Sequence, residues 1–223
     1  CNITPGERYG TLRRVVNRYN SEINGYFICD RGRFGFDYVN SPERIRLSPE
    51  ISDDVEKKLE QFMTDDTIGI GSPRASNESN FALRELVGED RFFSGLSDSD
   101  HEAVQLTLAL GQDAAFRSPS VKEIELADAV IIIGEDVTNT SPRVALALRQ
   151  SVRNYAMDLA KQSQIPAWQD AAVRELAQHD RSPLAILTPY TTRLDDIASE
   201  IVIGPPSQLI EVAGAVAKAI SEN

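Results

Sequence analysis

The chain contains few of the residue types by which metal-binding and catalytic sites are usually recognised in a sequence. It contains two cysteines, two histidines and one tryptophan in 223 residues. Two cysteines do not make a disulfide framework, so we expect a reducing compartment. No stretch approaches the roughly 20 apolar residues of a membrane span, and no signal peptide is recognisable, so the sequence predicts a soluble chain. Because it begins with Cys1 and not with methionine, we expect it to be an internal fragment of a longer protein.

The chain as a whole also lacks a basic surface. Its formal net charge is −11 and its isoelectric point is near 4.7, which argues against binding to nucleic acid or to an anionic membrane. The first 46 residues differ, because eight arginines there outnumber five acidic residues. This uneven charge predicts two modules, residues 1–46 and residues 47–223.

Residues 1–46 predict a small, irregular, mostly β module. Strand patterns occur at 11–19 and 26–28, and Asn20-Ser21 and Asn24-Gly25 are turn signals between them. Helical periodicity is absent. A module this small with so few apolar residues needs a staple or a neighbour to be stable.

Residues 47–223 predict an α/β domain. Short apolar runs alternate with longer amphipathic patterns, which is typical of a mostly parallel, doubly wound sheet with helices on both faces. The run 129–134 is apolar throughout and predicts a central parallel strand. Further strands are expected at 67–71, 92–93, 184–187 and 201–203, and helices at 53–63, 76–87, 100–110, 168–178 and 206–220, with others beginning at the Ser120/Glu123 capping box and at Ser141-Pro142.

The two cysteines carry little meaning by spacing alone. Free cysteine is usually a small buried hydrophobe, and a [4Fe–4S] cluster needs four thiolates where this chain supplies two. The residues after Cys29, which read Asp-Arg-Gly-Arg-Phe-Gly, change this interpretation. They resemble the Leu-Cys-x-Lys-Gly-Arg-Phe pattern that closes the N-terminal cluster domain of the molybdopterin oxidoreductase family. Glycines let backbone amides approach cluster sulfurs, and arginines offset the charge of four thiolates.

Two later segments resemble the same family. From the residues alone, Gly71 to Phe81 is a turn and a capped helix at a strand end, where α/β folds bind anions. It is similar to the family's Ser-x-Arg-x-x-x-Asn-Glu-x-Asn stretch, which faces the molybdenum cofactor, and Gly134 to Pro142 is similar to the loop that touches the cofactor's guanine nucleotide. The resemblance implies cofactor-facing positions at Ser72, Arg74, Asn77, Glu78, Glu135 and Asp136.

The departures from the family pattern bear on function. No cysteine follows Cys29, so the family's molybdenum-ligating cysteine is missing. Ser97 or Ser99 lies near the position in the sequence where this ligand is expected. The family's Asp-Pro-Arg is Thr188-Pro189-Tyr190 here, and its Gly-Thr-Asp is Pro205-Pro206-Ser207. Two carboxylates that could accept hydrogen bonds from the guanine or ribose of the cofactor are therefore absent. We expect the fold without molybdopterin, and the cofactor-facing loops, including Thr188, to be vestigial.

A chain that has the cluster cysteines but lacks the residues that bind the molybdenum cofactor resembles the large iron–sulfur subunits of bacterial NADH–quinone oxidoreductase, the proton-translocating respiratory complex I. Residues 1–14, 71–88, 134–138, 144–147 and 192–198 carry this resemblance. It implies that Cys1 and Cys29 are the third and fourth ligands of a [4Fe–4S] cluster and lie close in space. It further implies an electron-transfer role, packing against other peripheral-arm subunits, and a cytoplasmic position at the inner membrane without insertion into it. The isolated chain would be inactive and free of the cluster.

Two alternatives stay open. The chain can belong to a molybdenum oxidoreductase of the formate dehydrogenase or nitrate reductase type, or it can be a metal-free structural interaction domain. The remaining candidates favour structural roles: we expect His101 and His179 at the surface, Trp168 in the core, and Asp53-Asp54 and Asp195-Asp196 as charges at helix starts.

Overall fold

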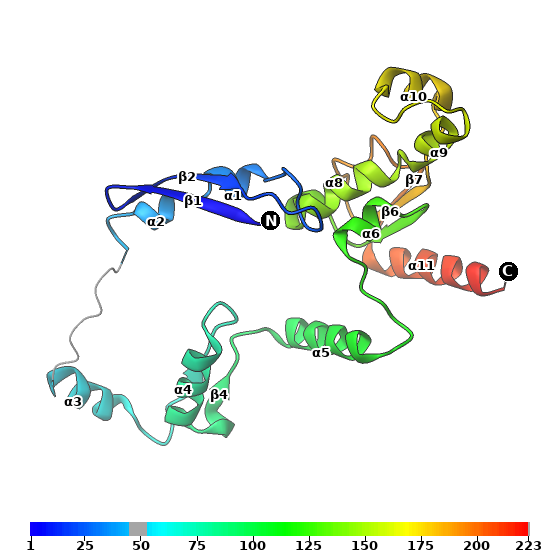
Figure 1. The fold of residues 1–223 in the computed structure, drawn as a ribbon. Coiled ribbons are helices and arrows are strands. Elements are labelled where there is room, and N and C mark those ends of the chain that lie inside the picture. Colours follow the sequence, from blue (N-terminus) through cyan, green and yellow to red (C-terminus); the bar gives the residue numbers. More distant parts are fainter. Residues whose placement is uncertain (45–52, 223) are drawn as a thin grey trace. The chain divides into compact units, whose positions relative to one another are not determined.

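The structure is a computed structural model that describes residues 1–44 and 53–222. Figure 1 shows the path of the chain, which divides into two compact units. One unit consists of Cys1–Arg44 and Pro119–Asn223, and the other is Ile45–Ser118. We call residues 1–44 the N-terminal module, residues 53–118 the middle segment and residues 119–222 the α/β segment. The domain boundary predicted at residues 46 and 47 lies outside the described residues.

The N-terminal module is a hairpin followed by two short helices. Strands β1 (Ile3–Arg8) and β2 (Thr11–Asn17) pair antiparallel, and helices α1 (Asp30–Phe34) and α2 (Asp37–Asn40) come after them. Tyr9 and Gly10 join the strands with φ of 55° and 73°, the left-handed backbone that tight hairpin turns require. The mostly β prediction thus holds for the hairpin, while the expected absence of helix is wrong.

The strand predicted at 26–28 is also wrong. Residues 27 and 28 run in irregular conformation, and no strand of the described chain pairs with them. The Phe27 N–H donates to the Asn24 carbonyl at 2.8 Å, and the Phe27 carbonyl accepts from the Asn24 side chain at 3.1 Å. A local turn and a side-chain amide therefore satisfy the backbone groups that a neighbouring strand would otherwise satisfy.

The middle segment pairs two short strands in parallel and confirms most of the elements predicted there. Ser76 and Ser97 cap the helices that follow them by accepting hydrogen bonds from the Ser79 and Asp100 backbone N–H groups. An added Cβ on Gly69 would lie 2.8 Å from Val87, so glycine permits this close approach of strand and helix. The elements are α3 (Asp53–Phe62), β3 (Gly69–Ile70), α4 (Asn77–Val87), the 3-10 helix η1 (Glu89–Arg91), β4 (Phe92–Phe93) and α5 (Asp98–Gln112).

The α/β segment contains a three-stranded parallel sheet in the order β5-β6-β7. Its elements are α6 (Val121–Glu125), β5 (Val130–Ile133), α7 (Val137–Thr140), α8 (Pro142–Ser151), α9 (Asn154–Gln162), α10 (Asp170–Ala177), β6 (Leu184–Thr188), β7 (Glu200–Ile203) and α11 (Pro206–Ser221). The capping box of Ser120 and Glu123 is present at α6. The described chain is therefore mixed α/β, with small sheets that are partly parallel.

The central position predicted for 129–134 is wrong. Strand β6 occupies the middle of this sheet and β5 lies at an edge within the described residues. Ile131 and Ile133 are 40% and 50% exposed, whereas Ile186 in β6 is fully buried. An apolar run indicates a strand that can be covered on both faces, but it does not fix the strand's lateral place in the sheet.

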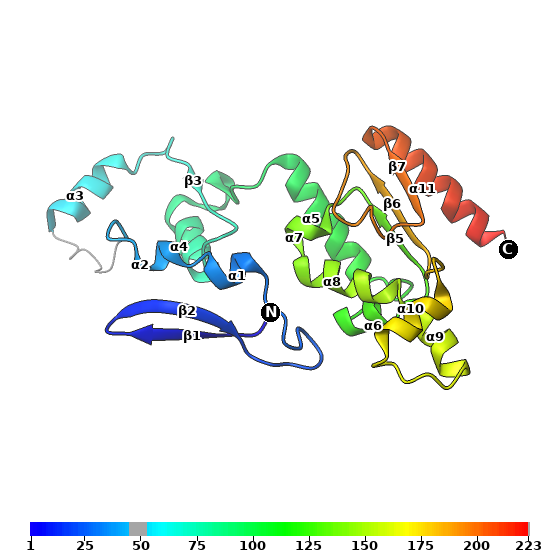
Figure 2. The same ribbon diagram turned by 90° about the horizontal axis from the view of Figure 1, so that it is seen from above.

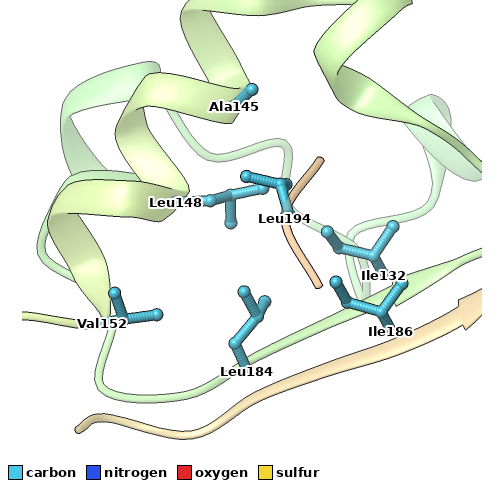
Figure 3. Packing of buried hydrophobic residues seen from close by; sticks show 7 residues of the cluster. All are labelled: Ile132, Ala145, Leu148, Val152, Leu184, Ile186 and Leu194. Carbon is cyan, nitrogen blue, oxygen red and sulfur yellow. The ribbon is translucent and has the colours of Figure 1, made fainter. Parts of the chain in front are cut away.

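The hydrophobic core lies between one face of this sheet and α8. Figure 3 shows Ile132, Leu184 and Ile186 pointing from the sheet toward residues of α8 and toward Leu194. Complete burial of a Leu or Ile side chain contributes about 1.5–3 kcal/mol, so this cluster stabilises the segment. Helix α11 lines the opposite face, across an apolar cleft of about 430 Å³ that includes Ile131 and Ile133. Figure 2 shows α8 and α11 on the two sides of the sheet.

Several smaller expectations are settled by exposure and position. His101 and His179 are exposed, as predicted, and Asp53 begins α3. Trp168 is 81% exposed, so its predicted core position is wrong; it lies in the turn before α10. Asp195-Asp196 begins no helix but forms a turn, in which Asp196 pairs with Arg149. Among the described helices, none has the length and apolarity needed to cross a membrane.

Candidate metal centre around Cys29

Cys29 stands at the start of helix α1. It is the N-cap residue, its backbone is extended (φ −74°, ψ 160°), and its side chain is a half-buried free thiol. An added Cβ on Gly32 would lie 3.8 Å from the Cys29 sulfur and 3.3 Å from Ile28. Glycine at this position therefore keeps the surface beside the sulfur free of a side chain.

Cys1 is an exposed free thiol just before strand β1. The residue that follows it, Asn2, donates its backbone N–H to Oδ1 of Asn24 at 3.1 Å. In both Figure 1 and Figure 2 the N-terminus lies beside the beginning of α1. The structure therefore brings the two cysteine-bearing segments into the same part of the N-terminal module.

One buried asparagine ties these segments together. Asn24 is 2% exposed. Its Oδ1 accepts from Asn2, next to Cys1, and its Nδ2 donates to the carbonyl of Phe27, two residues before Cys29. Nδ2 also faces the carbonyls of Arg18 and Gly25 at 3.4 and 3.3 Å. Sequence reasoning recognised Asn24 only as a turn residue, because nothing in the turn signal shows that the side chain is buried.

The donors near Cys29 fit an iron–sulfur cluster in kind but not in number. Thiolates are the ligands that such clusters take, four for a [4Fe–4S] cluster. Within residues 1–44 and 53–222, no group of three or more His, Cys, Asp or Glu is placed to hold a metal ion. Cys1 and Cys29 can therefore provide half of the thiolates, and the described residues contain no substitute for the other half.

An open cleft of about 370 Å³ lies beside Cys29. Arg31 and Arg193 contribute cationic side chains to it, and Asp30 contributes a carboxylate. The described lining residues are Phe27, Ile28, Cys29, Asp30, Arg31, Thr138, Asn139, Pro142 and Arg193. The α/β segment thus supplies part of the surroundings of Cys29, including residues of the loop between Gly134 and Pro142.

That loop uses its own carboxylate internally. Asp136 is 7% exposed. Its Oδ1 accepts from the Thr138 backbone N–H and hydroxyl, and its Oδ2 accepts from the Asn139 amide at 2.7 Å. Glu135 beside it is exposed. Thr188, at the end of β6, is 1% exposed and donates its hydroxyl to the Tyr190 carbonyl.

The strand-to-helix turn of the middle segment holds the other four predicted positions. The Ser72 hydroxyl accepts from the Arg74 backbone N–H at 3.2 Å, and Asn77 is the first residue of α4. Arg74, Asn77 and Glu78 are exposed. The Glu78 backbone N–H, and then the Ser76 hydroxyl, hold the pKa of the Glu78 carboxyl below its ordinary value. This turn belongs to the second compact unit, and Cys29 belongs to the first.

Arg143 links the two parts of the first unit through a hydrogen bond and also forms an ion pair within the α/β segment. Arg143 in α8 donates Nε–H to the Ile23 carbonyl at 2.7 Å and Nη2–H to the Glu125 carboxylate at 2.5 Å. Burial alone would raise the pKa of Glu125, but hydrogen bonds from Lys122 and Arg143 outweigh it and lower the pKa. No sequence signal marks Arg143, because its partners lie 18 and 120 residues away.

Comparison with known proteins agrees with the resemblance carried by the cysteines. Residues 1–41 match the model of the molybdopterin oxidoreductase Fe4S4 domain. Over 228 aligned residues, the chain is 46% identical to the G subunit of NADH-quinone oxidoreductase from Pseudomonas fluorescens, covering 99% of this chain and 25% of that protein. The G subunits from Pseudomonas putida KT2440 and Escherichia coli K12 are each 44% identical over 99% and 100% of this chain, and 25% and 26% of their own lengths.

The chain belongs to the family of these G subunits. It spans about a quarter of the length of the relatives that it matches. The Fe4S4 match covers Cys1, Asn24 and Cys29 together, so the domain match falls on the module in which the structure gathers these residues.

Proposed function

We propose that this chain is a piece of an iron–sulfur electron-transfer subunit of an NADH–quinone oxidoreductase, in which Cys1 and Cys29 ligate one [4Fe–4S] cluster. The observation that carries the proposal is the Fe4S4 domain match over residues 1–41, which contains both thiols of the chain. The kinship with the G subunits over nearly the whole chain supports it. The other two thiolates come from outside this chain.

A bound cluster of this kind supplies one-electron transfer, and the residues of the chain hold and surround it. Cys29 presents its thiol at the start of α1, with Gly32 leaving room beside the sulfur. Asn24 holds the segments next to the two cysteines. Arg31 and Arg193 add positive charge in the adjoining cleft, which favours the anionic assembly of four thiolates and iron.

The finer architecture belongs to the same proposal. We assign residues 1–46 to the end of the cluster module and residues 47–223 to a doubly wound domain of the molybdopterin oxidoreductase type that binds no molybdopterin. The burial of Asp136 and Thr188 and their hydrogen bonds to neighbouring residues support this, because neither side chain is exposed to a ligand. The partners are other subunits of the peripheral arm of complex I, on the cytoplasmic side of the inner membrane.

The decisive experiment compares metal content in the full-length protein that contains this chain. After anaerobic reconstitution, the Cys29→Ser variant should hold about four irons fewer than the unsubstituted protein, the content of one [4Fe–4S] cluster. The reduced unsubstituted protein should show a paramagnetic signal that the variant lacks. Equal iron in both proteins would favour the metal-free structural domain. Bound molybdenum with a guanine dinucleotide would favour a molybdenum oxidoreductase instead.

A further inference from the structure

Arg143 contacts a residue that lies far from it in the sequence. It lies in the first turn of α8, yet its Nε–H reaches the carbonyl of Ile23 in the N-terminal module at 2.7 Å, across 120 residues of sequence. Its Nη2–H donates to Glu125, and the two side chains are only 13% and 16% exposed. One guanidinium thus joins the module to the α/β segment.

An arginine at this place carries costs. A cation in the first turn of a helix opposes the helix dipole. The Arg143 Nη1 is buried and has no hydrogen-bond partner in the part of the chain that the structure describes, which adds a desolvation penalty. Glu125 offsets part of this, but a smaller apolar residue at the same position would avoid the penalty altogether. The contact with Ile23 is what such a residue would lose.

The backbone of Ile23 is held by hydrogen bonds on both sides of its Cα. Its N–H donates to the Asn20 side chain at 3.1 Å, and its carbonyl accepts from Arg143. The same turn is closed by the Gly25 N–H, which donates to the Asn20 carbonyl at 2.7 Å. Asn24 lies between these fixed points, and its amide holds Asn2, next to Cys1, and Phe27, two residues before Cys29.

We propose that Arg143 is a positioning residue for the cluster: by holding the Ile23 carbonyl against α8, it fixes the turn whose Asn24 sets the segments of Cys1 and Cys29. This inference rests on the proposed function, because it needs a cluster whose geometry can respond. Arg143 does not touch the thiols. Its effect passes through the Asn20–Gly25 turn, so it should alter how the cluster is held more than whether the α/β segment folds.

The test compares two arginines of the α/β segment in the full-length protein. Arg153 is the control, because its guanidinium also bonds a carboxylate, that of Asp170, and neither residue lines the cleft beside Cys29. Arg143→Gln should speed the loss of this cluster to an iron chelator about tenfold, the effect of losing one charge-assisted hydrogen bond. Arg153→Gln should leave the rate unchanged. The Cys29→Ser protein isolates the signal of this cluster by difference.

A second variant separates positioning from folding. Arg143→Lys keeps a cation opposite Glu125, but a single ammonium lacks the forked geometry that serves two acceptors. We expect a melting temperature near that of the unsubstituted protein, together with fast cluster loss and a changed spectrum of the reduced cluster. Unchanged loss rate and spectrum in Arg143→Lys, or equal behaviour of Arg143→Gln and Arg153→Gln, would overturn the role of Arg143. Absence of iron from the unsubstituted protein would instead overturn the proposed function.

Discussion

The N-terminal module and the α/β segment are held together by different forces. Val15 and Ile28 are the buried hydrophobic residues of the described module, whereas the α/β segment packs a continuous apolar cluster around Leu184 and Ile186. The module relies instead on a hairpin and on hydrogen bonds from one buried amide, that of Asn24. A region with so little apolar burial needs an additional constraint, and the proposed cluster supplies one where the α/β segment needs none.

Removal of iron should produce the largest difference in stability between the two regions. In the full-length protein, a chelator that strips the cluster should reduce the local unfolding free energy of β1, β2 and the Asn20–Gly25 turn nearly to zero, as for a mobile loop. The amides of β6 should keep their protection, because its core does not include the cysteines. Hydrogen exchange followed by mass spectrometry measures both regions at once. Equal loss of protection in β6 would show that the two regions depend on the metal alike.

Truncation of a core side chain should destabilise the α/β segment and leave the iron content unchanged. Leu184 is fully buried, and Leu184→Ala should lower the unfolding free energy of the α/β segment by about 2–5 kcal/mol. Ile131→Ala is the control, since Ile131 is 40% exposed in the same sheet. Hydrogen exchange in β6 gives the change, and iron content should stay constant. If Leu184→Ala released the iron, the core and the cluster module would have to unfold together.

Substitution of the buried Asn24 amide should destabilise the N-terminal module alone. Asn24→Asp replaces an amide donor by a carboxylate that faces the Phe27, Arg18 and Gly25 carbonyls. The module should lose about 1–3 kcal/mol, the usual cost of a buried polar group left without its partner. Protection of β1 and β2 should fall while that of β6 does not. Asn77→Asp makes the same chemical change at an exposed position of the middle segment and provides the control.

The smallest expected effect is a pH dependence at the junction of the two regions. The folded pKa of Glu125 lies below its ordinary value of 4.5. Its stabilising contribution is therefore complete above about pH 4.5 and is lost as the pH falls through the lowered folded pKa. Glu125→Gln should cost about 1 kcal/mol at pH 7, and the difference from the unsubstituted protein should shrink on acidification. Thermal melts across this range measure it; a constant difference would contradict the assigned pKa direction.

Local patterns made many elements of this fold predictable. The Ser120/Glu123 capping box and the cap at Ser76 mark helices that the structure contains, because capping depends on residues three positions apart. The parallel pairing of 184–187 with its neighbours also followed from the alternation of strands and helices. The lateral order of strands did not, since the run 129–134 is equally apolar at an edge or in the centre.

The candidate site depended on context more than on spacing. The ligand role predicted for Cys1 and Cys29 came from the residues around Cys29, and the Fe4S4 match covers the same stretch. Asn24 and Arg143 could not be found in this way, because their roles come from burial and from partners far apart in sequence. Trp168 failed for a related reason: size and apolarity favour burial, but the turn before α10 leaves the ring exposed.

The Asn24-Gly25 pair also bears on how the protein ages. In a flexible chain, the nitrogen of a glycine can attack the amide of a preceding asparagine and convert it to aspartate, which is one reason asparagine is thermolabile. In the folded module the Gly25 nitrogen is engaged with the Asn20 carbonyl, and the Asn24 amide is held by backbone partners on both of its ends. Deamidation must therefore pass through the opened module, so a protein that retains its cluster also protects this asparagine from chemical decay.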